Sequence, residues 1–405
     1  MNKVALVVGA TGTAGNGVVD HLLSTEEWEV IAISRNIKTS NQKNLKTIQI
    51  NLLDAKDLEE KLKGIPVTHL YYTAMERDYA FKALKIGLSV KLMKFFLLLA
   101  RFFLPLINIL IKLGLKDLYF NSIDFMSGSA DPDNTNFKML QNIINVLEKN
   151  NPSLKSVSLV SGGKYYGVHL GPNLNPQWKT PFEENDPRYH EGGRNYYYKM
   201  EDFLQNKAKV KNWNWTIIRP NFIIGFSENA PYNLGLTMAI YAFILKELNM
   251  PLIFPGDLKT FNASWEICSA KGLGRIFEWG IEKNEVFNYT SGRPFKWKDI
   301  WPKLGKYFEM EIEIRENGFS VINFFKKNGS SWEKVVKKHN LKCYKVHELV
   351  NPSFFENSMV LDWDVIYSME KAKKFGFIEE EEPSQIFFDL FNNLKERNII
   401  PKSNK

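Results

Sequence analysis

The sequence contains few of the residues from which disulfide frameworks and metal sites are built. Its 405 residues include two cysteines, Cys268 and Cys343, which lie far apart and form no CxxC pair. The six histidines are scattered, with no HExxH-like spacing. These absences argue against a disulfide scaffold and against a metal centre. We therefore expect no bound metal, and a reducing compartment such as the cytoplasm.

Nucleic-acid signatures and long uncharged apolar runs are missing as well. No apolar stretch reaches the ~20 residues that a membrane-spanning helix needs, and the first residues lead directly into a strand without the layout of a signal peptide. The net charge is +8, but no zinc finger or aromatic-interleaved basic run accompanies it, so we expect no nucleic-acid partner. With 44% hydrophobic and 24% charged residues, the composition is that of a globular protein.

The N-terminus has the pattern of a strand, a glycine-rich turn and a helix. Residues 4–8 are a continuous apolar run, typical of a buried parallel strand. The following GATGTAG turn lets the backbone approach a pyrophosphate, which then meets the N-terminus of the next helix. This context makes the GxxGxxG spacing informative and predicts a Rossmann unit. The residues expected to contact the dinucleotide here are Gly9, Thr11, Gly12, Thr13, Ala14 and Gly15.

The second expected strand, residues 29–33, ends at Ser34-Arg35-Asn36. An acidic residue at this place would hold the ribose 2′-hydroxyl of NADH, whereas Arg35 suits the 2′-phosphate of NADPH through charge-assisted hydrogen bonds. The sequence therefore predicts NADPH as the cofactor, with NADH as the alternative, and Ser34, Arg35 and Asn36 as cofactor contacts.

Further strands are expected at residues 47–50, 67–72, 156–160 and 215–218, alternating with helical stretches such as 137–147. This alternation predicts an α/β fold with a doubly wound parallel sheet of the Rossmann type. Ligands of such sheets lie at the carboxyl ends of the strands. The cofactor contacts expected at these ends are Asn51, Leu52, Thr73, Ala74, Ser161 and Pro220. We expect residues 1–225 to form the nucleotide-binding domain, with an insertion at 80–124, and residues 226–405 to form a smaller substrate-binding lobe.

Ordinary short-chain dehydrogenases place a catalytic tyrosine and lysine on one helix as Tyr-x-x-x-Lys. The lysine anchors the nicotinamide ribose and lowers the tyrosine pKa, and the tyrosine polarises the substrate oxygen. In this chain only Tyr367 and Lys371 have that spacing. They lie well beyond the sixth strand, so we interpret them as a chance match on a C-terminal helix. The expected place instead reads NYYYKMED at 195–202, preceded by SGGKYYG at 161–167.

These two segments resemble the TGxKHYxG-like and NFYYxxED-like motifs of the progesterone 5β-reductase/iridoid synthase family (PRISE), which are extended short-chain dehydrogenases. The resemblance assigns Lys164 and Tyr197 as the catalytic pair, with Tyr198 as the neighbouring alternative. Residues 219–227 resemble the family's RPxxIFGFS segment beside the nicotinamide, which adds Ile223 and Ser227 to the cofactor contacts. Asn51 departs from the family's usual aspartate near the adenine.

The resemblance implies reduction of the activated C=C bond of an enone or enal, with a small lipophilic carbonyl compound as substrate. Tyr197 would stabilise the enolate oxygen, while Lys164 would anchor the ribose and tune Tyr197. Two alternatives stay open. One is a sugar-nucleotide epimerase or dehydratase, which normally needs a lysine where Glu201 stands. The other is a non-catalytic NADPH sensor that binds a partner protein.

The insertion at 80–124 is strongly apolar and carries basic residues at near-helical spacing. No acidic residue lies between Asp78 and Asp117. Pro105 would kink or divide a helix here. We expect residues 86–118 to make peripheral contact with a membrane surface as a basic amphipathic helix or helical hairpin. Packing against the body of the protein, or in a homodimer interface, is the alternative. The basic positions of this stripe are Lys91, Lys94, Arg101, Lys112 and Lys116.

Overall fold

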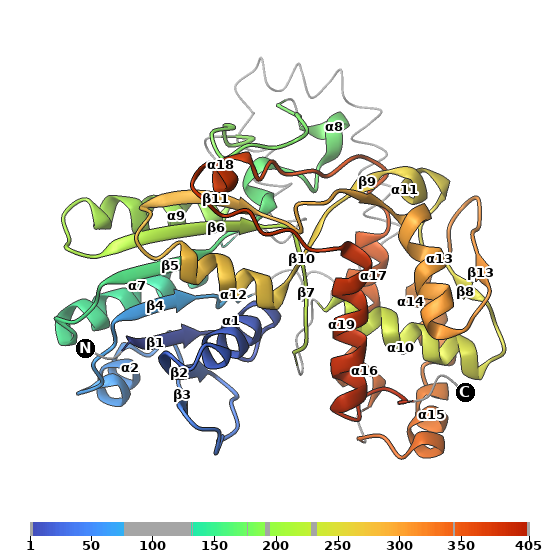
Figure 1. The fold of residues 1–405 in the computed structure, drawn as a ribbon, viewed down its shortest axis with the longest axis horizontal. Coiled ribbons are helices and arrows are strands. Elements are labelled where there is room, and N and C mark those ends of the chain that lie inside the picture. The colour runs from blue at the N-terminus through green and yellow to red at the C-terminus, as the bar shows by residue number, and fades with distance from the viewer. Residues whose placement is uncertain are drawn as a thin grey trace.

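A computed structural model describes residues 3–76, 131, 133–175, 177–190, 195–227, 233–342 and 345–402. Its centre is a seven-stranded, fully parallel sheet with the order β11-β6-β5-β4-β1-β2-β3 (Figure 1). The strands are β1 (Lys3–Val8), β2 (Trp28–Ser34), β3 (Leu45–Gln49), β4 (His69–Tyr72), β5 (Ser156–Val160), β6 (Asn214–Pro220) and β11 (Glu285–Tyr289).

Helices cover both faces of this sheet because its central strands are apolar on both sides. Alternate residues of β1 enter different cores. Val4, Leu6 and Val8 pack under one helical layer, and Ala5 and Val7 pack under the other. The first layer contains α2 (Ala55–Leu62), α7 (Thr135–Asn150) and α9 (Tyr196–Ala208), and the second contains α1 (Thr13–Ser24), α12 (Ala270–Trp279) and α18 (Glu370–Lys374). The predicted doubly wound α/β fold is confirmed.

The second lobe, on the right of Figure 1, is mainly helical and is built around α10 (Leu234–Glu247). This helix is apolar on all sides, and every residue from Leu234 to Leu245 is buried. The helices α15 (Ser331–His339), α17 (Pro352–Ser358) and α19 (Pro383–Glu396) pack around it. The other helices of this lobe are α11 (Leu258–Asn262), α13 (Trp297–Phe308), α14 (Val321–Asn328) and α16 (Val346–Leu349).

Short strand pairs connect the lobes and brace the second one. They are β7 (Phe222–Ile224) with β10 (Ile267–Ser269), β9 (Ser264–Trp265) with β12 (Phe295–Lys296), and β8 (Leu252–Ile253) with β13 (Ile312–Glu313). Two further short helices, η1 (Gly163–Tyr166) and α8 (Gly171–Leu174), follow β5.

The structure differs from the expected division at residue 225 in one respect. The chain enters the second lobe after β7 but returns to the sheet to form α12 and the edge strand β11. Helix α12 packs closely on α1, with the Gly17 backbone beside Ala270. Residues 270–289, which include α12 and β11, therefore belong to the nucleotide-binding lobe, although they follow residue 225.

The whole insertion at 80–124, including the predicted membrane contact at 86–118, lies outside the described residues. Among the residues that are described, no helix has the length and apolar character required to cross a membrane.

Candidate active site

The glycine-rich turn after β1 fits tightly against the end of β4. Gly9 has a φ of +80°, which favours glycine. A Cβ atom on Gly15 would lie 2.3 Å from the Gly9 carbonyl oxygen and 2.7 Å from Thr73 Oγ1. The Thr73 hydroxyl donates to the Val8 carbonyl at 2.7 Å. Any side chain at Gly15 would displace this turn, so the backbone forms a narrow cradle at the carboxyl end of β1.

The N-terminus of α1 presents unpaired donors to this cradle. Its N-cap, Gly12, has no side chain to accept from the first helical N–H groups, and the first turn contains no acidic residue. The buried hydroxyls of Thr13 and of Ser227, which follows β7, have no hydrogen-bond partner among the described residues. Buried hydroxyls without partners are uncommon in proteins. A dinucleotide pyrophosphate would accept from such donors and interact favourably with the helix dipole, so these residues fit the cofactor.

The adenosine end of the predicted site gathers the ends of β2, β3 and β4. The hydroxyls of Thr11 and Ser34 are 2.8 Å apart. The side chain of Arg35 is 63% exposed, and its Nη1 lies 2.6 Å from Oε2 of Glu76. Asn51 Oδ1 accepts from the Leu53 backbone in a local turn, which leaves the adenine-facing role of Asn51 a prediction. The ends of these strands bring the predicted contacts to one edge of the sheet. The ion pair of Arg35 with Glu76 was not predicted from the sequence.

One asparagine joins the two segments that carry the predicted catalytic pair. Lys164 lies in η1, directly after β5, and Tyr197 lies in the first turn of α9. The Asn195 side chain caps α9 by accepting from the Tyr197 N–H at 3.1 Å, and its amide donates to the Lys164 carbonyl at 3.0 Å. Asn195 thus fixes the start of the helix relative to the strand end that carries the lysine.

The three consecutive tyrosines of α9 place their hydroxyls in three different surroundings. A Cβ on Gly162 would lie 3.1 Å from the Tyr197 hydroxyl and 3.9 Å from the Pro220 carbonyl, which puts this hydroxyl at the ends of β5 and β6. The Tyr198 hydroxyl donates instead to the Tyr165 carbonyl at 2.9 Å. That of Tyr196 contacts the Met75 sulfur. Of the three, Tyr197 is the one whose hydroxyl reaches the carboxyl edge beside Gly162.

Glu201 occupies the place that lysine holds in Tyr-x-x-x-Lys. Its carboxylate accepts from Nε and Nη2 of Arg219 at 3.1 and 2.6 Å and from the Ser161 hydroxyl. The Arg219 guanidinium lies 3.3 Å from the centroid of the Tyr165 ring, and it also donates to the Tyr166 hydroxyl. Ser161, predicted as a cofactor contact, is therefore part of a buried network that links α9 to the carboxyl ends of β5 and β6.

Tyr367 reaches this region in a way that its sequence position did not suggest. It precedes α18 and forms an isolated bridge with Phe182. A Cβ on Gly163 would lie 1.4 Å from the Tyr367 hydroxyl, so that hydroxyl packs directly against the turn that carries Lys164. Burial raises the pKa of Tyr367. Lys371 pairs with Glu285 at 2.6 Å, so the two residues do not act as a catalytic pair.

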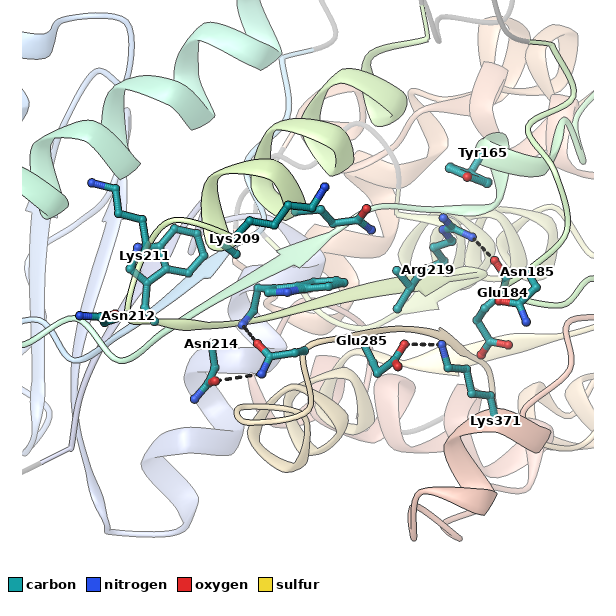
Figure 2. Close-up of a pocket in the computed structure, with 16 residues that line it drawn as sticks. Tyr165, Glu184, Asn185, Lys209, Lys211, Asn212, Asn214, Arg219, Glu285 and Lys371 are labelled. Atoms are coloured by element: carbon teal, nitrogen blue, oxygen red, sulfur yellow. Dashed lines mark hydrogen bonds and ion pairs between the residues drawn. The ribbon is translucent and has the colours of Figure 1, made fainter.

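A polar cleft of about 880 Å³ lies along β6 and the edge strand β11 (Figure 2). Arg219 and Tyr165 lie at one end of it, and Lys209 and Lys211 lie towards the other. The Glu285–Lys371 ion pair also lines the cleft. None of the residues predicted to bind the cofactor or to catalyse lines this cleft, so it is separate from the candidate active site.

Comparison with known families agrees with this geometry. A model described as "PRISE-like Rossmann-fold domain" matches residues 114–401. The chain belongs to this family. Residues 5–86 also match the NAD dependent epimerase/dehydratase family, which shares the N-terminal nucleotide-binding unit. The predicted family is thus confirmed, and the protein is a nicotinamide-dependent enzyme of the short-chain dehydrogenase superfamily.

Among curated relatives, the (S)-8-oxocitronellyl enol synthase of Antirrhinum majus is 27% identical over 98% of this chain and 93% of its own length. The 3-oxo-Delta(4,5)-steroid 5-beta-reductase of Arabidopsis thaliana is also 27% identical, over the same shares of both chains. The crystal structure of a putative epimerase from Burkholderia cenocepacia has a TM-score of 0.60 at 14% identity, covering 97% of this chain and 98% of its own, and shows the shared fold.

Proposed function

We propose that this enzyme reduces the activated C=C bond of an enone or enal with NADPH. The observation that carries the proposal is the position of the Tyr197 hydroxyl beside Gly162, at the strand end that leads into Lys164. The names of the two plant relatives support it, since one is a steroid 5β-reductase and the other an enol synthase. NADPH would supply a hydride to the β-carbon of the substrate.

Negative charge then accumulates on the carbonyl oxygen as an enolate. Tyr197 would donate a hydrogen bond to that oxygen, and one preorganised donor of this kind contributes about 3 kcal/mol of transition-state stabilisation. Lys164 would anchor the nicotinamide ribose and supply positive potential beside the phenol. Asn195 is a positioning residue, since it holds the Tyr197 backbone and the Lys164 carbonyl together. A proton from solvent would then add to the α-carbon and complete the reduction.

The epimerase alternative needs a lysine four residues after the catalytic tyrosine, and the structure has the Glu201 carboxylate there, committed to Arg219. This arrangement favours the reductase, which takes its lysine from the end of β5. The deciding assay follows NADPH oxidation by absorbance with small enals, cyclic enones and steroid enones. Turnover of one of these classes supports the proposal. Epimerisation of a UDP-sugar without turnover of any enone would contradict it.

A further inference from the structure

An ion pair crosses the carboxyl end of β1, where a dinucleotide must bind. Val8 at the end of β1 pairs with Ile33 of β2 on one side and Tyr72 of β4 on the other. The two flanking strands are about 10 Å apart, because neighbouring strands are spaced by roughly 4.8 Å. Arg35 follows β2 and Glu76 follows β4, and their side chains meet at 2.6 Å. The pair therefore joins the strands on either side of the phosphate-binding turn.

The two partners are held to very different degrees. The Glu76 backbone is clamped by Asn136, whose side chain accepts from the Glu76 N–H at 2.7 Å and donates to the Glu76 carbonyl at 2.9 Å. Asn136 is itself buried, and its N–H donates to Asp131 at 2.7 Å. The Glu76 side chain is 14% exposed, whereas that of Arg35 is 63% exposed. Glu76 is thus the fixed member, and Arg35 is free to reorient towards solvent or a ligand.

We propose that Glu76 is a cofactor-specificity residue that competes with the 2′-phosphate of NADP(H) for Arg35. A 2′-phosphate carries close to two negative charges and requires the guanidinium that Glu76 engages. A carboxylate at the same place repels that phosphate, but it can accept a hydrogen bond from the 2′-hydroxyl of NAD(H). The Arg35–Glu76 ion pair would therefore set the relative affinities of the site for NADP(H) and NAD(H). The proposal rests on dinucleotide binding at this edge and does not depend on which substrate is reduced.

The test measures dissociation constants of NADP⁺ and NAD⁺ by titration calorimetry on the full chain. In Glu76→Gln we expect NADP⁺ to bind about three- to tenfold more tightly, with NAD⁺ unchanged or weaker. Glu59→Gln is the matched control, because Glu59 also forms a 2.6 Å ion pair, with Lys149, and loses the same charge. Its ratio of the two dissociation constants should equal that of the wild type.

A double-mutant comparison separates competition for Arg35 from general repulsion. In an Arg35→Gln background, Glu76→Gln should have a clearly smaller effect on NADP⁺ binding than it has in the wild type. Glu76→Asp shortens the carboxylate's reach and should shift the ratio of the NADP⁺ and NAD⁺ dissociation constants in the same direction. This variant replaces Glu76→Gln in the test if the glutamine variant is unstable. The proposal is overturned if the ratio stays within about twofold of wild type in both variants, or if the Glu76→Gln shift is equal with and without Arg35. An enzyme that binds NADP⁺ but reduces no enone would leave this result intact.

Discussion

Glu201 and Arg219 form an ion pair that is almost completely enclosed. Arg219 Nη2 lies 2.6 Å from Glu201 Oε2, and the side chains of Arg219 and Glu201 are 3% and 2% exposed. Glu201 follows Tyr197 by one helical turn, and Arg219 is the penultimate residue of β6. Charges buried this deeply are tolerated because each satisfies the other, so the pair fixes α9 against the sheet at the level of the candidate active site.

Glu201→Lys would recreate the sequence pattern Tyr-x-x-x-Lys but should not recreate the usual catalytic pair. The new ammonium would be buried beside Arg219, and breaking a buried pair costs about 3–5 kcal/mol of stability. We expect a large fall in the denaturant midpoint. Asp202→Asn is the control on the same helix, because Asp202 is 48% exposed and its pair with Arg188 should be worth less than about 1 kcal/mol. Equal losses in the two variants would contradict this account of Glu201.

Removal of the hydroxyl should lower activity at Tyr197 but not at the adjacent Tyr198 of α9. Tyr197→Phe should lower kcat for enone reduction by about 10²–10³-fold, because it deletes the donor to the enolate oxygen. Tyr198→Phe removes the hydroxyl that donates to the Tyr165 carbonyl, which should cost about 1 kcal/mol of stability and leave kcat nearly unchanged. Steady-state kinetics and thermal unfolding of both variants measure the contrast. Full activity in Tyr197→Phe would remove this residue from its proposed role.

Two glycines of the phosphate-binding turn should differ in their tolerance of alanine. At Gly15 a Cβ would lie 2.3 Å from the Gly9 carbonyl, whereas at Gly12 the nearest atom would be 3.3 Å away. We expect Gly15→Ala to distort the cradle, costing about 1–3 kcal/mol of stability, and to weaken NADP⁺ binding at least tenfold. Gly12→Ala should have the smaller effect on both. Calorimetric titration and thermal unfolding provide the readouts, and wild-type affinity in Gly15→Ala would disprove the steric argument.

Protonation of His69 should lower the free energy of unfolding at acidic pH. Burial lowers the pKa of this residue to about 4, with a smaller contribution from Lys155, and its ring packs edge-on against Trp28. The unfolded chain, with a histidine pKa near 6.5, binds the proton first as the pH falls. The stabilisation is therefore complete above pH ~6.5 and is lost towards pH ~4, by at most about 3 kcal/mol.

His69→Phe isolates this effect in urea unfolding between pH 7 and pH 4. The variant should lose less stability over that range than the wild type does. The buried carboxyl of Glu266, whose pKa burial raises to about 7, acts in the opposite direction, since its contribution is lost as the pH rises. That contribution is common to both proteins and cancels in the comparison. Parallel pH curves would exclude His69 as the source.

Local sequence patterns were sufficient to predict most strands of the sheet. The strand predicted at 156–160 coincides with β5, and the apolar run at 4–8 differs from β1 by one residue. Buried parallel strands are continuous apolar runs, which makes them readable without tertiary information. The edge strand β11 was assigned to the other lobe, because its place in the sheet depends on a chain return that no local pattern encodes.

The predicted site residues were selected because they lie in motifs or at strand ends. These signals predict where the backbone runs, but they do not predict which side chains pair with each other. For this reason Glu76 was missed, and Tyr367 was interpreted only as a chance motif match. Glu76 follows β4 without any motif, and Tyr367 is brought to Gly163 by a bridge with Phe182, far away in sequence. The signal for Asn195 was present, since an asparagine directly before a helix is a common N-cap. Its second bond, to the Lys164 carbonyl, needed the fold.

The late return of the chain to β11 has a consequence for biosynthesis. A nascent chain that has emerged only as far as β7 exposes β6 as an unpaired sheet edge and leaves α1 without the helix that packs over Gly17. Such an edge is a template for association with other chains. The sheet closes only when residue 289 is available, by which point α10 of the other lobe has already been synthesised. The two lobes are therefore expected to mature together, and a fragment ending near residue 225 should be recovered as aggregate.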